Sequence, residues 1–385
     1  MNQSTVSISF KEHPLSVVLA SLRKDKFFLL LFSSLILLSI QHPSKIASYP
    51  ALVDWPTIGA LTGLLVLTKG LELSGSLHRF GQHLIGLMAT ERAMAVCLVI
   101  TAAILSTVLT NDVALFVIVP LTVGVCRIAK LPTIRLIVFE ALAVNAGSAL
   151  TPIGNPQNLF LWQFSKVSFG NFVIHMLPLV ALLMATLLAV VVAVFKVRAI
   201  QLTDREQVAS VDRTMLCISL VLYLPFLVAT DLRYAGTAVT TVLLAFLILR
   251  PQVLAQLDWG LLLVFILMFI DLRLISSLSV VQEGMHNIGL DHPKHLYFAS
   301  IAISQIVSNV PAAIAMTEYS ANWSVIAYAV NIGGFGLAVG SLANLIALRM
   351  AGDSRGWLSF HCYAIPFLCV AMILGYAVLA CKNML

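Results

Sequence analysis

Four short polar interruptions lie inside strongly apolar stretches of this chain, and each carries residues that can hold a small ion. They are Thr110-Asn111-Asp112, Gly154-Asn155-Pro156 followed by Asn158, Ser308-Asn309, and Ser341 followed by Asn344. Amide, hydroxyl and carboxylate oxygens suit a hard cation such as Na⁺. Helix N-termini beside unwound backbone offer free N–H groups and a positive dipole end to an anion. The residue types therefore indicate a site for an anion, a cation or both.

Asp112 is the most informative single residue, because it is ionisable and lies in otherwise apolar sequence. Such a residue inside a membrane is costly and by default indicates function. It could ligate Na⁺, carry a coupling proton, or cap the helix that follows. The second half of the chain has Val310 at the corresponding place. We therefore expect the ion chemistry to be concentrated in the first half, with a possible Na⁺ site near Asn111, Asp112 and Asn155.

The composition places these residues in a membrane protein. Of 385 residues, 60% are hydrophobic and only 10% are charged, which is too few charges for the surface of a soluble domain. The net charge of +6 reflects Lys and Arg in cytoplasmic loops rather than nucleic-acid binding. The six Cys residues form no CxxC motif, so neither a metal centre nor a cofactor other than a possible Na⁺ is expected.

Two of the interrupted segments are expected to be re-entrant hairpins. Residues 93–126 would span about 50 Å as one straight helix, which is too long for a single crossing. Residues 297–320 form a shorter segment of the same kind, for which a single kinked span is the alternative. With both treated as hairpins and the N-terminus inside, 17 of the 23 Lys and Arg residues are cytoplasmic. If residues 93–126 crossed once, this positive-inside bias would vanish.

The chain contains an internal repeat. Residues 141–159 and 327–345 are identical at 8 of 19 positions with a constant offset. Farther out, Asp54-Trp55 corresponds to Asp258-Trp259, and Thr110-Asn111 to Ser308-Asn309. In the predicted topology the paired helices start from opposite sides of the membrane, so the repeats are inverted.

The predicted fold is an all-α polytopic membrane protein made of two inverted repeats, each with a re-entrant hairpin and a broken transmembrane helix. Residues 1–200 form the first repeat, with its hairpin at about 93–126 and its broken helix at about 136–164. Residues 201–213 form a cytoplasmic connector. Residues 214–385 form the second repeat, with its hairpin at about 297–320 and its broken helix at about 323–348.

Other groups carry less chemistry. Glu140 follows Arg135 by about one turn, so an interfacial ion pair is expected there. An intramembrane enzyme such as a protease would need a Ser/His or paired-Asp constellation at one depth, and none is evident. The chain also lacks the GxxxxGK[ST] motif of a nucleotide-driven pump. We therefore expect a transporter and not an enzyme.

The segments LTNDVALFVIVPL at 109–121, GSALTPIGNPQNLFLW at 147–162 and VSNVPAAIAM at 307–316 resemble the ion transporter superfamily. That group includes citrate transporters, arsenite permeases, divalent anion:sodium symporters and one class of sodium/proton antiporter. The resemblance implies a dimerising scaffold domain, and a transport domain whose hairpin tips bind sodium and substrate carboxylate. The tips map to Thr110-Asn111 and Ser308-Asn309, and the first broken-helix loop to Gly154-Asn155-Pro156. Dicarboxylate members carry Ser-Asn-Thr at both tips, whereas the Asp here is closer to the citrate and arsenite branches.

The leading hypothesis is a secondary active transporter of a small anion, either a carboxylate or an inorganic oxyanion, that works by alternating access. Coupling to Na⁺ or H⁺ is expected through Asp112. A Na⁺/H⁺ antiporter of the same fold is the alternative. The expected location is a bacterial cytoplasmic (inner) membrane, with a cytoplasmic N-terminus. The expected partners are the anion, the coupling cation, the lipid bilayer and a second copy of the chain, and no nucleic acid.

Overall fold

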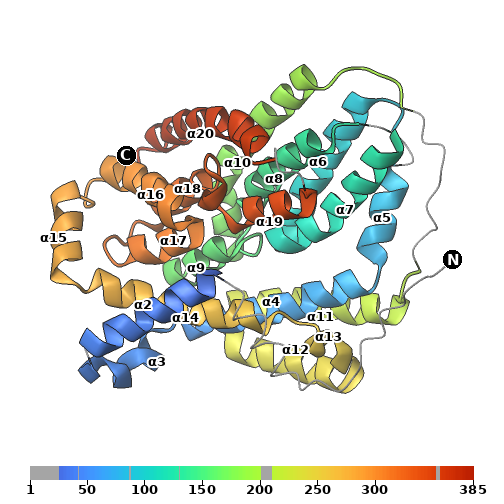
Figure 1. Ribbon diagram of the computed structural model, residues 1–385. Coiled ribbons are helices and arrows are strands. Elements are labelled where there is room, and N and C mark those ends of the chain that lie inside the picture. The colour runs from blue at the N-terminus through green and yellow to red at the C-terminus, as the bar shows by residue number, and fades with distance from the viewer. Residues whose placement is uncertain (1–25, 42, 86–87, 130, 201–209, 353–355) are drawn as a thin grey trace.

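The computed structural model describes residues 26–41, 43–85, 88–129, 131–200, 210–352 and 356–385. These residues are almost entirely helical and contain no β-strand, apart from one isolated bridge between Thr90 and Ala199. The predicted all-α class is confirmed (Figure 1). The N-terminal 25 residues and most of the predicted 201–213 connector lie outside the described part, so their cytoplasmic placement stays a prediction.

The first half contains nine α-helices and one 3-10 helix in the described residues. They are α2 (Lys26–Gln41), η1 (Pro43–Ser48), α3 (Tyr49–Leu52), α4 (Trp55–Leu73), α5 (Ser76–Ile85), α6 (Glu91–Val108), α7 (Asn111–Ala129), α8 (Thr133–Ser148), α9 (Pro156–Ser165) and α10 (Phe169–Val194). The breaks between α6 and α7 and between α8 and α9 fall at the first two polar interruptions.

The second half repeats this series of helices after one additional helix. Its elements are α11 (Arg213–Asp231), α12 (Ala235–Leu249), α13 (Pro251–Ala255), α14 (Trp259–Ser276), α15 (Ser279–Ile288), α16 (Pro293–Val307), α17 (Asn309–Thr317), α18 (Trp323–Ile332), η2 (Ala338–Gly340), α19 (Leu342–Ala351) and α20 (Gly356–Cys381). The breaks between α16 and α17 and between α18 and α19 fall at the other two interruptions. The segment 297–320, for which a single kinked span was the alternative, forms two helices that pack against each other.

The Asp-Trp pairs at the start of α4 and α14 adopt the same local structure. Asp54 Oδ1 accepts a hydrogen bond from the N–H of Thr57 at 2.9 Å, and Asp258 Oδ1 accepts one from Leu261 at 3.1 Å. Each aspartate therefore caps its helix. In both cases the indole N–H of the following tryptophan donates to the carbonyl five residues earlier. This recurrence supports the predicted duplication, whose inverted orientation remains a prediction.

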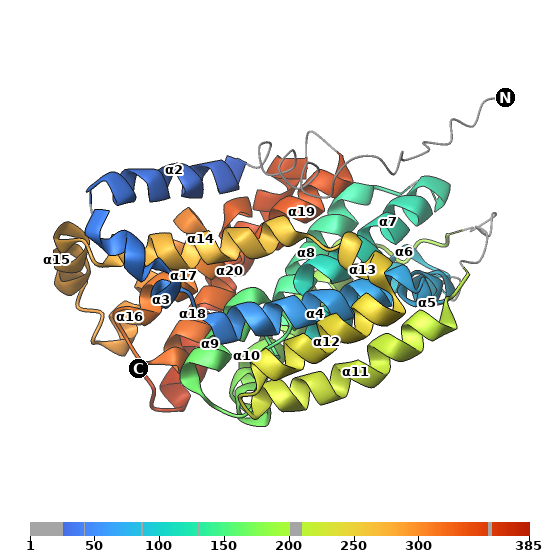
Figure 2. The ribbon, with the colours of Figure 1, turned by 90° about the horizontal axis from the view of Figure 1, so that it is seen from below.

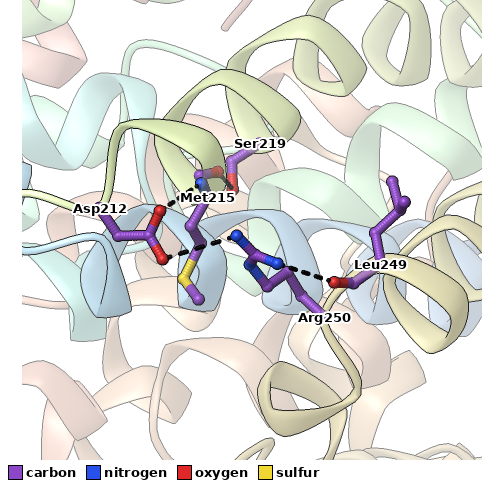
Figure 3. A network of polar contacts seen from close by, with 5 residues as sticks. All are labelled: Asp212, Met215, Ser219, Leu249 and Arg250. Carbon is purple, nitrogen blue, oxygen red and sulfur yellow. Dashed lines mark hydrogen bonds and ion pairs between the residues drawn. The ribbon is translucent and has the colours of Figure 1, made fainter.

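Helices α4, α11, α12 and α13 form one layer, which Figure 2 shows as a group of adjacent helices. A polar network ties the start of α11 to the end of α12 (Figure 3). Asp212 caps α11 by accepting from the N–H of Met215 at 3.0 Å, and its second oxygen lies 3.8 Å from Arg250 Nη2. We call these four helices the scaffold layer.

Eight of the remaining helices pack around α8 and α18, the first halves of the two broken helices. Every residue of α8 from Leu136 to Ser148, and every residue of α18 from Ser324 to Ile332, is buried. Helices α6, α7, α10, α19 and α20 contact α8, and α9, α10, α16, α17 and α20 contact α18. The two chain breaks that follow α8 and α18 are therefore held in the interior of the protein.

The outer surface is apolar. Leu224 on α11, Ile248 on α12 and Ile373 on α20 are 68%, 77% and 70% exposed, as expected for side chains that face lipid. Five described helices, α6, α10, α11, α14 and α20, are long and apolar enough to cross a bilayer, and the bent α2–α3 segment would make a sixth. The chain is a polytopic membrane protein.

Candidate functional site

At each of the two predicted hairpin tips the chain breaks between two helices that pack against each other. Helix α6 ends at Val108 and α7 begins at Asn111, while α16 ends at Val307 and α17 begins at Asn309. The backbone N–H of Asn111 donates to the carbonyl of Gly154 at 2.9 Å, so the first tip directly contacts the first broken-helix loop. At the second tip Ser308 has φ +77° and ψ 158°. This region is almost restricted to glycine, and strain of this kind concentrates at functional sites.

A small cavity lies where the four breaks meet. Its lining residues come from the first turns of four helices and from one face of α14. They are Asn111 and Asp112 (α7), Pro156 (α9), Asn309 and Val310 (α17), Ser341 and Leu342 (at the start of α19), and Leu261 and Phe265 (α14). The N-termini of four half-helices therefore converge on one point. Their positive dipole ends favour an anion there, although the N–H groups of Asn111 and Asp112 already have acceptors and Pro156 has no N–H.

Several polar groups at the cavity have no partner within the described residues. The side-chain amide nitrogens of Asn111 and Asn309 donate no hydrogen bond, although both residues are nearly buried. The buried hydroxyl of Thr110, which precedes the lining residue Asn111 but is not itself part of the lining, is also unpaired. Buried polar groups are rarely left unsatisfied, so these groups are candidates for ligand contacts.

The carboxylate of Asp112 likewise has no hydrogen bond or ion pair within the described residues. Its own backbone N–H is bound by Asn111 Oδ1 at 3.0 Å. The capping role considered for Asp112 is therefore not seen. Asp258, the cap of α14, lies within electrostatic range of Asp112. A cation or proton at Asp112 would relieve the repulsion between these two carboxylates.

The two broken helices are joined by a network of asparagines that crosses between the halves. Asn145 Nδ2 donates to Asn344 Oδ1 at 2.7 Å, and Asn331 Nδ2 donates to Asn158 Oδ1 at 2.7 Å. Asn145 Oδ1 accepts from Ser341 Oγ at 3.0 Å. These residues occupy corresponding positions in the repeat, so each bond has its counterpart in the other half.

The network changes what several predicted site residues can do. Asn158 and Asn344 are fully buried, and their amides also bind carbonyls of their own loops, Ser148 and Gly334 respectively. Asn155 donates to Ser148 Oγ at 3.1 Å and to Asn331 Oδ1 at 3.0 Å. These side chains hold the breaks in shape, whereas Asn111, Asp112, Asn309 and Ser341 line the cavity itself.

Glycines allow the hairpins to approach the broken helices closely. A Cβ on Gly147 would lie 2.3 Å from the carbonyl oxygen of Ala103 on α6, and one on Gly333 would lie 2.4 Å from Ser304 Cβ on α16. Gly154 is equally confined, since a Cβ there would lie 2.3 Å from the carbonyl oxygen of Ser148. Its role at the site is to let the loop reach the first tip.

The sequence motifs did not identify two residues that hold the hairpins against the broken-helix loops. Thr107 Oγ1 lies 2.9 Å from the carbonyl oxygen of Ala103 in its own helix and 3.1 Å from that of Gly147, so its one proton is shared between them. Gln305 Nε2 donates to the carbonyl of Gly333 at 2.6 Å. Each lies four residues before a tip asparagine, so extending the repeat by one helical turn would have found both. Leu261 and Phe265 gave no such signal, because they are apolar residues in an apolar helix.

The expected ion pair between Glu140 and Arg135 is wrong. Glu140 is completely buried in α8, where the Thr122 hydroxyl on α7 donates to its Oε1. No ion pair involves Glu140 within the described residues. The two residues are five apart, a spacing that turns their side chains to different faces of a helix, and α8 packs on all sides at Glu140.

The sequence of this chain is similar to a transporter family and to several membrane proteins. A family model described as "Citrate transporter" matches residues 15–324. The inner membrane protein YbiR of Escherichia coli is 45% identical over 361 residues, which cover 94% of this chain and 97% of that protein. An uncharacterized transporter of Methanocaldococcus jannaschii is 31% identical over 86% of this chain and 91% of its own. A silicon efflux transporter of Oryza sativa is 29% identical over 143 residues, 37% of this chain and 30% of its own.

Proposed function

The chain belongs to the citrate transporter family, and on that premise we propose that it is a secondary active transporter of a small anion. Membrane transport, rather than enzymatic activity, follows from the family and from relatives named as transporters. The substrate class, the coupling ion and the mechanism are proposed here from the geometry of the cavity. The substrate is a carboxylate or an inorganic oxyanion.

The observation that carries this proposal is the convergence of four half-helix N-termini on one cavity. An anion there would accept hydrogen bonds from those backbone N–H groups of the first turns that have no acceptor, and from the amide nitrogens of Asn111 and Asn309. Ser341 can add its hydroxyl by exchanging its bond to Asn145. No Lys or Arg lines the cavity in the described residues. Binding by dipoles and amides keeps the anion releasable, which a carrier requires.

The coupling cation is proposed to sit at the first tip. Asp112 supplies a carboxylate with no other partner, and Asn111 and the loop at Gly154–Asn155 supply oxygens nearby. A Na⁺ ion or a proton there would neutralise Asp112 and so favour the anion a few ångströms away. The cation and the anion would then load together, as coupled transport requires.

Alternating access is supported by the paired contacts of the two halves. A site at the interface of two equivalent halves can face either side of the membrane when the halves exchange conformations. The packed body around α8 and α18 would move as the transport domain against the scaffold layer. A homodimer formed through the scaffold layer stays a prediction, as does the cytoplasmic N-terminus. We place the protein in a bacterial inner membrane, as the name of the Escherichia coli relative indicates for that protein.

A Na⁺/H⁺ antiporter is the second candidate function, and the unpaired Asp112 carboxylate favours it. In an antiporter, Asp112 would bind Na⁺ and H⁺ in turn, and the four helix N-termini would have no ligand of their own. A further substrate to include is silicic acid, because one relative is named a silicon efflux transporter.

Ligand-induced thermal stabilisation of the purified protein tests the proposal. Citrate, C4-dicarboxylates, sulfate, arsenite and silicic acid are screened with and without Na⁺ at several pH values. A ligand at 100 times its Kd stabilises the folded state by about 2.7 kcal/mol. We expect one anion class to raise the melting temperature of the wild type and not that of Asn309→Ala. Stabilisation by Na⁺ alone, with no response to any anion, would favour the antiporter.

A further inference from the structure

Glu140 is a buried carboxylic acid that the proposed transport cycle does not use. It lies in the middle of α8, and its side chain has no solvent exposure. Helices α6, α7, α10, α19 and α20 enclose α8. An ionised carboxylate in such a place is far more costly than one at the surface.

The hydrogen bonds of Glu140 are incomplete in either protonation state. Its Oε1 accepts from the hydroxyl of Thr122, whereas its Oε2 has no partner among the described residues. A carboxylate would lack a counter-ion, and a carboxylic acid could donate its proton to the Thr122 hydroxyl but would still leave Oε2 without a donor. A purely structural residue at this position would be expected to have both oxygens satisfied.

The neighbouring titratable groups do not neutralise Glu140. The thiol of Cys126 on α7 is within electrostatic range of it and of Glu91 at the start of α6. Asp112 faces the tip cavity from the opposite end of α7. The other charged or titratable side chains on the enclosing helices form neither an ion pair nor a hydrogen bond with Glu140 in the described chain. They are Arg92, Cys97, Arg127, His175, Arg349, His361, Cys362, Tyr363, Cys369, Tyr376 and Cys381, of which Tyr363 packs on the neighbouring Phe139 with ring centroids 5.0 Å apart.

The position of Glu140 links it mechanically to the tip cavity. Its partner Thr122 lies 11 residues after Asn111, or about 16 Å along α7. On α8, Glu140 precedes Asn145 by five residues, or about 7.5 Å. Both helices that carry the Glu140–Thr122 contact therefore end in the breaks that form the site. A change of charge at Glu140 would alter the contact between those two helices.

We propose that Glu140 is a second proton-binding site, separate from the tip cavity and from the cation at Asp112, and that it takes up and releases one proton in each transport cycle. In one state the carboxylate binds a proton and becomes a neutral acid, and in the other it returns that proton to water. This inference rests on the proposed transport function and adds to it the identity of a coupling group. Thr122 is the positioning residue for this carboxyl group.

Proteoliposomes that contain the purified full-length protein test the proposal. Substrate counterflow, with the same anion and the same pH on both sides, measures carriage without net proton movement. Acidification of a trapped pH-sensitive dye during net anion uptake measures proton coupling. The variant is Glu140→Gln, which keeps the shape of the side chain and cannot ionise. The control is Glu72→Gln, which removes a partly exposed carboxylate paired with Lys69.

We expect Glu140→Gln to retain counterflow and to lose anion-coupled acidification by about tenfold or more. The Glu72→Gln control should keep both signals. Intact acidification in Glu140→Gln, or no acidification in the wild type, would overturn the inference while leaving anion transport in place. Loss of counterflow together with acidification in a folded Glu140→Gln variant would also overturn it, because the residue would then act in binding or structure.

If Glu140→Gln does not fold, Thr122→Val supplies the test, since it removes the hydroxyl that contacts the carboxyl group. A shifted pH profile of acidification with unchanged counterflow would support the proposal, and an unshifted profile would overturn it. If the wild-type protein shows no counterflow of any anion, the proposed function is wrong, and the coupling role of Glu140 is wrong with it.

Discussion

The amide nitrogen of Asn145 lies 2.7 Å from the side-chain oxygen of Asn344, and this bond joins the break of the first half to that of the second. The bond between Asn331 and Asn158 has the same length and runs in the opposite direction. Neither broken helix is therefore held in shape by its own half alone. The cavity at the four helix N-termini exists only when both halves are docked.

Asn145→Ala is predicted to destabilise the protein. It removes three side-chain hydrogen bonds, two donated to Asn344 Oδ1 and the Gly334 carbonyl and one accepted from Ser341, and it leaves Asn344 Oδ1 and Ser341 Oγ without their partners in the interior. Each buried group left unsatisfied costs about 1–3 kcal/mol. Equilibrium unfolding in mixed micelles measures the loss, and Asn171→Ala, at an exposed position on α10, is the control.

A double-mutant cycle separates the bond from the burial of each side chain. Asn145→Ala combined with Asn344→Ala should be less destabilising than the sum of the two single changes, by about 0.5–3 kcal/mol. Strict additivity would show that the two amides do not stabilise each other, and would argue against a network that joins the halves.

Gly147→Ala is predicted to lower stability by about 1–3 kcal/mol, because the new methyl group would overlap the backbone of α6. Its Cβ would lie 2.3 Å from the Ala103 carbonyl oxygen, which cannot move without the helix. Gly170→Ala is the matched control, since a Cβ there meets no atom within 4 Å. Equal melting temperatures for the two variants would contradict the close approach of α6 and α8.

Ser308→Gly is predicted to stabilise the fold by about 1–3 kcal/mol, because glycine adopts φ +77° and ψ 158° without strain. Ser308→Ala keeps the strain and removes only the hydroxyl, so it serves as the control. If the strained backbone orients the second tip for ligand binding, Ser308→Gly should have a higher melting temperature than the wild type and should be stabilised less by the ligand. No gain over Ser308→Ala would indicate that the backbone is relaxed.

Asp112→Asn and Asn309→Ala are predicted to abolish transport while the protein is still produced and folded. Asp112→Asn removes the charge that the coupling cation neutralises, and Asn309→Ala removes an unpaired amide donor at the cavity. Uptake by proteoliposomes, normalised to incorporated protein, is the measurement. Normal uptake in both variants would show that the site lies elsewhere.

The helical fold and its four breaks could be predicted because their signals are local. The apolar run at residues 93–126 is too long for one membrane-spanning helix, and Thr110-Asn111-Asp112 mark the place where it breaks. The internal repeat aligns Asn145 with Asn331, so their equivalence can be seen in the sequence. The contact between Asn145 and Asn344 could not be predicted, because it depends on how two segments 199 residues apart dock.

The sequence also could not show which site residues face the cavity and which are used in structural hydrogen bonds. Asn158 and Asn309 look equally suited to binding a ligand. The side chain of Asn158 makes its hydrogen bonds within the asparagine network, whereas Asn309 lines the cavity. Glu140 looked like a partner for Arg135, because spacing along a helix does not reveal that α7 brings Thr122 to the other face. Whether a polar side chain is free to bind a ligand depends on how the helices pack, and the sequence shows only which side chains are present.

Radiolabelled anion uptake into proteoliposomes, driven by an imposed Na⁺ or pH gradient, tests the central claim most directly. We predict that one of citrate, a C4-dicarboxylate, sulfate or arsenite accumulates against its gradient in the wild type and not in Asp112→Asn or Asn309→Ala. Cation exchange by the wild type in the absence of any transported anion would contradict the account, since the four helix N-termini would then have no anion to bind.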